Sequence, residues 1–125
     1  MRIDRFEDII AWQKAKILTV KVYSLFDASK DFAFKDQIQR ASVSIMNNIA
    51  EGFDSETNAE FIRFLRYAKR SCTEVQSELY VALDEDYISS NEFKDIYEQA
   101  SRTHVAIHGF INYLKKYEER KAANR

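Results

Sequence analysis

Hydrophobic residues recur every three or four positions along most of the chain, the spacing that places them on one face of an α-helix. The last run keeps this spacing without a break, at Phe93, Tyr97, Ala100, His104, Ile107, Ile111 and Leu114. The pattern predicts a single domain, residues 1–125, with four helices and a frayed basic tail. The helices are expected at residues 6–26, 32–54, 57–86 and 90–117, and the tail at residues 118–125.

Short polar segments separate these runs, and two of them contain signals for the start of a helix. Thr57 with Glu60, and Ser89 with Glu92, have capping-box spacing, in which a hydroxyl and a carboxylate bind free amides of the first turn. Acidic residues at 84–86 oppose the helix dipole and favour an end of the third helix there. Four helices joined by short loops predict an all-α, antiparallel up-down-up-down four-helix bundle.

The composition supports long helices. The 125 residues include no proline and two glycines, Gly52 and Gly109. All-β folds are disfavoured because their many turns depend on glycine and proline. Gly-rich phosphate-binding loops are excluded because they need several glycines close together.

The charge is nearly balanced, with 19 basic and 20 acidic residues and a net charge of −1. This excludes a protein that is basic overall and still permits a local basic patch. The start of the sequence carries charges of both signs, from which we expect no signal peptide, and no apolar run reaches about 18 residues. We therefore expect a soluble cytoplasmic protein that does not enter a membrane.

The second predicted helix has two apolar sides. One side is a core stripe formed by Phe34, Ile38, Ala41, Ile45, Ile49 and Gly52. The other consists of Val43, Met46, Ala50 and Phe53. A second apolar side requires a second partner, either another helix or another subunit, and we predict that it forms an oligomer interface.

A polar line runs between these two sides, at Gln37, Arg40, Ser44, Asn48 and Glu51. Because apolar faces flank it, we expect Arg40, Ser44, Asn48 and Glu51 to be partly buried and to bond to neighbouring helices or subunits. The line is either a network that fixes the packing or a recognition site.

Basic residues gather on the third predicted helix. Arg63, Arg66 and Arg70 share one side, Lys69 and Tyr67 lie close by, and no acid occurs in residues 61–73. Such a stripe can bind nucleic-acid phosphates with little sequence preference, and a tyrosine can stack on a base. Lys115 and Lys116 begin a second basic patch. A solvated surface or salt bridges between subunits would produce the same pattern.

Three residues, His104, His108 and Cys72, are candidates for metal binding or catalysis. His104 and His108 are four apart, but neither the Glu-x-x-His pattern of di-iron bundles nor the zinc-protease pattern is present. Cys72 lies on the apolar stripe of the third helix without a base at motif spacing. We expect structural histidines, an inert thiol, no cofactor and no enzyme; a metal-binding bundle is the remote alternative.

The segment from Gln37 to Gly52 resembles the signature of a bacterial four-helix-bundle family whose members are often encoded in intervening sequences of large-subunit ribosomal RNA genes. The start of the chain, Phe6-Glu7-Asp8-Ile9 with Trp12-Gln13, is similar to the family's start. The third helix is similar at Glu60-Phe61, Phe64-Leu65, Ala68, Ser71 and Glu74.

This resemblance implies a ring-like homo-oligomer, a pentamer, without enzymatic activity. The family is similar to the accessory variability proteins of diversity-generating retroelements, basic pentamers that engage RNA or DNA and a reverse transcriptase. Gln39 stands here where a second Arg is usual, and Arg70 replaces a common Gly. A nucleic-acid-binding oligomer and a protein-interaction scaffold therefore both stay open.

Overall fold

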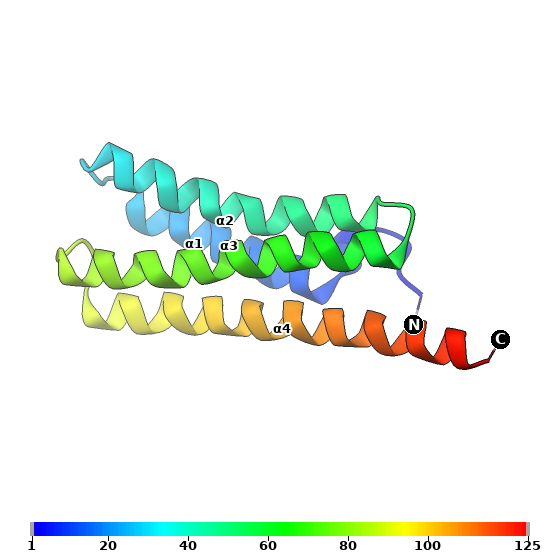
Figure 1. The fold of residues 1–125 in the computed structure, drawn as a ribbon. Helices are drawn as coiled ribbons and strands as arrows, with labels where there is room; N and C mark the ends of the chain where they lie inside the picture. The colour runs from blue at the N-terminus through cyan, green and yellow to red at the C-terminus, as the bar shows by residue number, and fades with distance from the viewer. Residues whose placement is uncertain (1, 125) are drawn as a thin grey trace.

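The computed structural model describes residues 2–124, which form four α-helices and one short 3₁₀ turn, with no strand among them (Figure 1). The elements are η1 (Phe6–Asp8), α1 (Ile10–Phe26), α2 (Phe32–Phe53), α3 (Asn58–Asp84) and α4 (Ser90–Ala123). The all-α fold class is confirmed, and the four helix positions agree with the sequence pattern except near some ends.

Consecutive helices run in opposite directions, which places their connections at alternate ends of the bundle (Figure 1). Helix α1 packs against α2 and α4, and α3 packs against the same two helices from the other side. Within residues 2–124, α1 and α3 lie diagonally across the bundle, with no Cα atom of one within 8 Å of a Cα atom of the other. The two helices therefore present their outer faces on different sides of the molecule.

The core consists of the predicted stripes, with a shift of one position in α4. Ile96, Ala100, Thr103 and Ile107 are buried, whereas His104, expected in this stripe, is half-buried at its edge. Thr103 fits in the core because its hydroxyl donates a 2.8 Å hydrogen bond to the Gln99 carbonyl. Near the end of α3, Ala82 is buried and Leu83 is half-buried.

The helix ends show which capping signals are used. Ser89 and Glu92 form a complete capping box, with the Ser89 hydroxyl accepting from the Glu92 amide and the Glu92 carboxylate accepting from the Ser89 amide. At the start of α3, Thr57 accepts from the Glu60 amide at 3.1 Å. The third helix ends at Asp84, as the acidic run at 84–86 predicts.

The expected fraying from Glu118 is wrong, because α4 continues to Ala123. Asn58 donates a 2.8 Å hydrogen bond to the Glu118 carboxylate and thereby ties this part of α4 to the start of α3. Arg120 and Lys121 lie in the last turn, where cations interact favourably with the helix dipole.

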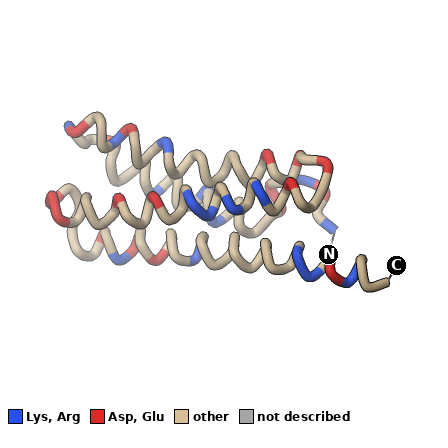
Figure 2. Tube along the Cα trace, in the orientation of Figure 1, with Lys and Arg blue, Asp and Glu red and all other residues tan. Residues whose placement is uncertain are grey.

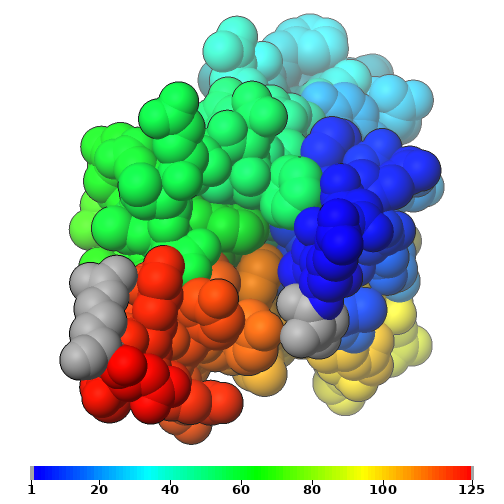
Figure 3. Space-filling view, turned by 90° about the vertical axis from the view of Figure 1, so that its right-hand side faces the viewer, coloured from blue at the N-terminus to red at the C-terminus, as the bar shows by residue number. Residues whose placement is uncertain are grey.

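Both ends of the described chain lie at the same end of the bundle (Figure 1). The N-terminal segment covers part of this end and lies against α2 and α4 (Figure 3). Phe6 of η1 packs edge-on against Trp12 of α1, with ring centroids 5.1 Å apart. The first half of α3 is at this end too.

Candidate nucleic-acid interface

The basic residues of α3 lie in its first half, and acidic residues gather toward its far end (Figure 2). Arg63, Arg66 and Arg70 are exposed, and Lys69 is half-buried. Their spacing of three and four residues places the three arginines on the outer side of the helix. The structure thus presents these side chains on one open surface.

Tyr67 lies between two of these arginines. The guanidinium carbons of Arg63 and Arg70 are each 5.9 Å from the centroid of its ring, which is cation–π distance. Phe64 packs edge-on against the same ring, with the centroids 6.1 Å apart. The phenol ring is 37% exposed, so an aromatic surface with a cation on either side along the helix is open to a ligand.

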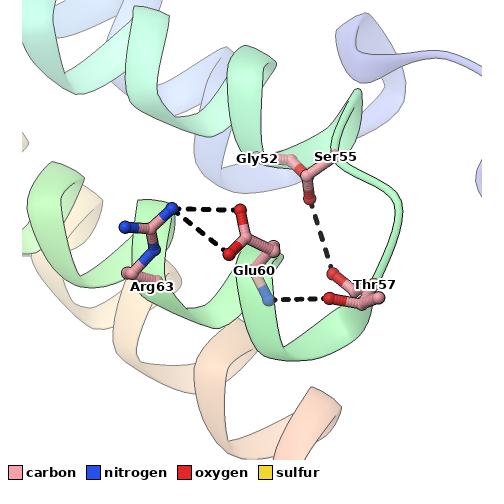
Figure 4. Close-up of polar contacts among 5 residues, drawn as sticks. All are labelled: Gly52, Ser55, Thr57, Glu60 and Arg63. Carbon is pink, nitrogen blue, oxygen red and sulfur yellow. Dashed lines mark hydrogen bonds and ion pairs between the residues drawn. The ribbon is translucent and has the colours of Figure 1, made fainter.

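Glu60 partly neutralises the start of this basic surface. Its carboxylate accepts two hydrogen bonds from Arg63 Nη2, at 3.0 and 3.2 Å (Figure 4). These contacts raise the pKa of Arg63 above its ordinary value. Because the carboxylate turns toward Arg63, the capping box predicted at Thr57 is formed only through the Thr57 hydroxyl (Figure 4).

Lys69 and His108 connect α3 to α4, with Lys69 Nζ 3.0 Å from His108 Nδ1. Burial, followed by the nearby Lys69 and His108, lowers the pKa of His104. No group of three His, Cys, Asp or Glu side chains in the described part of the chain is arranged to bind a metal ion. His108 thus lies at the contact between α3 and α4.

Lys115 and Lys116 are exposed on α4. Lys115 borders a hollow that it shares with Asn58 and Ile62 of α3. This places it beside the first turns of α3, at the same end of the bundle as the arginines. Glu118 and Glu119 line the same hollow, so the surface there has both signs of charge.

The polar line of α2 forms part of its contact with α3. The hydroxyls of Ser44 and Ser71 are 2.9 Å apart. Asn48 Nδ2 donates to the Ser44 carbonyl at 2.8 Å and to the Ser44 hydroxyl at 3.1 Å. Ser44 therefore bonds across to α3, whereas Asn48 bonds within α2.

The expected partial burial of Arg40 and Glu51 is wrong, because both side chains are exposed. Gln37, at the start of the polar line, is exposed as well. Arg40 pairs with Asp36, one turn earlier on the same helix, at 2.8 Å. The long side chains at the edges of the polar line extend into solvent, whereas Ser44 and Asn48 fit between the helices.

Glu78 is a half-buried carboxyl group beside the α2–α3 contact that the sequence pattern did not single out. Burial, followed by the nearby Glu74 carboxylate, raises its pKa to about 7, and the Gln37 amide opposes this shift. Its Oε1 atom is buried without a hydrogen-bond partner in the described chain. Only the tertiary packing identifies this group, because its local sequence is that of an ordinary helix surface.

The second apolar side of α2 is partly covered within the chain itself. Val43, Met46, Ala50 and Phe53 are all half-buried. Ala50 and Phe53 border a shallow hollow whose other wall is the N-terminal segment, including Phe6. A subunit contact through these four residues stays a prediction.

Cys72 is fully buried, and its Sγ donates to the Ala100 carbonyl at 3.3 Å. Burial raises the pKa of the thiol to about 12. A thiol with this pKa is protonated at neutral pH and is a poor nucleophile.

Residues 7–109 match the family described as 23S rRNA-intervening sequence protein. The chain belongs to this family. Among solved structures, it is similar to a protein of unknown function from the S23 ribosomal protein family of Bacteroides thetaiotaomicron. The sequence identity is 23%, the TM-score is 0.77, and the match covers 82% of this chain and 98% of the other. No curated protein sequence matches the chain.

The family of 23S rRNA-intervening sequence proteins therefore accounts for the fold, and the solved relative shares that fold. The segment that carries the family resemblance, Gln37 to Gly52, is the part of α2 that packs along α3. Within this segment the Ser44 hydroxyl bonds to that of Ser71 in α3, and Asn48 bonds back to Ser44; a recognition role for the polar line stays a prediction. Within residues 2–124, no helix combines the length and the apolar character of a membrane span.

Proposed function

We propose that the chain is a non-catalytic, homo-oligomeric nucleic-acid-binding protein, a pentamer, that binds RNA or DNA through the exposed basic half of α3. The observation that supports this most is the exposed ring of Tyr67 with Arg63 and Arg70 on either side. Arginines neutralise phosphates, and an aromatic face between them stacks on an unpaired base.

This surface would bind nucleic acid with little sequence preference. Arg63, Arg66 and Arg70 are suited to phosphate contacts, and such contacts carry no sequence information. The net charge of −1 does not oppose such binding, because the acidic residues of α3 other than Glu60 lie in its second half (Figure 2).

The binding is tested with labelled RNA and DNA of mixed sequence, by fluorescence anisotropy at low and moderate salt. The triple variant Arg63→Ala, Arg66→Ala, Arg70→Ala should lose at least about tenfold in affinity at low salt, with a shallower salt dependence. The matched control is Lys30→Ala, Lys94→Ala, Arg102→Ala, which removes three exposed cations elsewhere. Equal affinity of the two triple variants, or no binding by the wild type at low salt, would overturn the nucleic-acid proposal.

The oligomeric part of the proposal is tested by light scattering coupled to size-exclusion chromatography. A mass five times that of the single chain is expected. A monodisperse single chain at tens of micromolar would contradict it.

A protein-interaction scaffold is the second candidate function, and the exposed apolar residues Ile10, Ile17 and Val20 of α1 favour it. In that case the arginines of α3 are ordinary surface. The two triple variants would then behave alike toward nucleic acid, and a specific protein partner would dissociate on substitution of the apolar residues.

A further inference from the structure

Helix α1 has an apolar outer stripe that the rest of the chain does not cover. Ile10, Ile17 and Val20 are 58%, 48% and 60% exposed. Their spacing of seven and three residues aligns them along one side of the helix. Isolated apolar residues are common on surfaces, but an aligned set of β-branched residues indicates a contact surface.

Two apolar hollows extend this stripe. A cavity of about 270 Å³ beside Ile10 is lined by Ile3, Ile9, Phe110 and Tyr113. A second hollow follows Trp12, Ile17 and Val20 along α1. Apolar hollows therefore lie beside the stripe at Ile10 and again at Ile17 and Val20.

The charged residues of α1 itself are all positive, and Asp8, just before the helix, lines the first hollow. Helix α1 contains Lys14, Lys16 and Lys21 and no acidic residue. Lys21 pairs with Asp95 of α4 at 2.6 Å. Lys16 lies over the Trp12 ring, 5.8 Å from its centroid, one turn before Val20, and no ion pair joins it to an acid in residues 2–124. A surface that fits α1 must therefore be apolar and acidic.

The second half of α3 has this character. Glu74, Glu78, Val81 and Glu85 follow a 4-3-4 spacing and lie on one stripe, with Val81 50% exposed. No basic residue occurs between Ser71 and Asp86. Glu74 and Glu85 of this stripe are exposed, whereas Glu78 is half-buried with its Oε1 atom inside the chain.

We infer that the outer stripe of α1 docks on the second half of α3 of a second copy of this chain, with Ile17 and Val20 against Val81 and Lys16 near Glu74 and Glu78. This inference rests on the proposed homo-oligomer and names its contact surface. Because the two faces lie on different sides of the bundle, the contact joins copies head to tail. Such a contact closes into a ring when successive copies are suitably rotated.

The test measures the mass of the full chain by light scattering across a dilution series, with circular dichroism to verify folding. The double variant Ile17→Ser, Val20→Ser should be a folded single chain. Lys16→Glu and Glu74→Lys should each raise the dissociation concentration about tenfold, and the two together should restore most of the loss. Val105→Ser on α4 is the matched control, since Val105 is 69% exposed and lies outside both surfaces.

The outcomes separate this inference from the proposed function. A wild-type chain that is a single copy overturns the oligomer and this contact together. An oligomeric wild type whose mass is unchanged by Ile17→Ser, Val20→Ser overturns the contact alone. Basic and apolar helices also bind membranes. The proposed contact is therefore overturned too if the wild-type chain sediments with phosphatidylserine-containing vesicles and the variants have the same mass in solution as the wild type. Nucleic-acid affinity, measured on the same samples, tests the α3 surface separately.

Discussion

Gly52 at the end of α2 lies directly against Phe61 in the first turn of α3. A Cβ atom added to Gly52 would be 2.8 Å from Cδ1 of Phe61 and 2.9 Å from Cβ of Phe64. The missing side chain therefore allows the two helices to approach closely just before the basic surface begins. Arg63 follows Phe61 by two residues, so this contact also fixes where the arginines lie.

Replacing Gly52 with alanine should destabilise the fold. Overpacking costs about 1–3 kcal/mol, and the better helix propensity of alanine offsets up to about 1 kcal/mol of it. We expect a net loss of about 1–2 kcal/mol in urea unfolding. Gly109→Ala is the matched control, because open space surrounds that position in α4, and it should gain about 0.5–1 kcal/mol. Equal effects of the two substitutions would contradict the close approach.

Removing the Glu60 carboxylate should strengthen nucleic-acid binding. Glu60→Gln releases Arg63 from its ion pair while the Thr57 cap remains. At low salt the affinity for mixed-sequence RNA should rise a few-fold, with a steeper salt dependence. Glu98→Gln, which releases the exposed Arg102 on α4 in the same way, should change neither. An unchanged affinity for Glu60→Gln would show that Arg63 does not contact the ligand.

The Glu78 carboxyl group should make the stability of the single chain fall as pH rises. Its pKa is about 7 in the folded chain against an ordinary value of 4.5, so the folded state retains a proton that the unfolded state has lost. The stabilisation is present below pH 4.5 and is lost between about pH 4.5 and 7.

This pH dependence is measured by thermal unfolding from pH 5 to 8 in dilute solution, where a neighbouring subunit does not supply a cation. Glu78→Gln should flatten the profile and raise the melting temperature at pH 8. Glu56→Gln, in the exposed loop before α3, should leave the slope unchanged. A slope that survives Glu78→Gln would assign it to other groups.

Cys72 should resist thiol reagents in the native state. The thiol is buried beside Ala100, and its pKa is raised to about 12, so little thiolate forms at pH 8. Reaction with a disulfide reagent should require unfolding and be complete in denaturant. Rapid stoichiometric labelling of the native chain would contradict its burial.

Sequence spacing predicted the helices and most of the core because apolar periodicity directly reflects which side of a helix is buried. It assigned His104 to the core stripe instead of Thr103, since neighbouring positions on a helix differ by only part of a turn and a threonine can satisfy its hydroxyl within the helix. It overestimated the burial of Arg40 and Glu51, because long polar side chains at an interface edge extend into solvent.

The candidate site was predicted in part. The acid-free run of α3 located the arginines, but the pairing of Glu60 with Arg63 depends on side-chain conformation and was missed in favour of a capping box. The exposed stripe of α1 was not predicted, although the spacing of Ile10 and Ile17, seven residues apart, is a signal that could have found it. The state of Glu78 depends on α2 packing beside it, which no local pattern contains.

The position of both chain ends beside the start of α3 has a practical consequence. Any sequence joined before Arg2 or after Asn124 emerges at the end of the bundle that contains Arg63 and Lys115 (Figure 1). A charged affinity tag or a bulky fusion at either end would therefore lie next to the basic surface and compete with its ligand. The connection between α3 and α4, residues 85–89, is at the opposite end and offers an attachment point for dyes or supports that leaves that surface open.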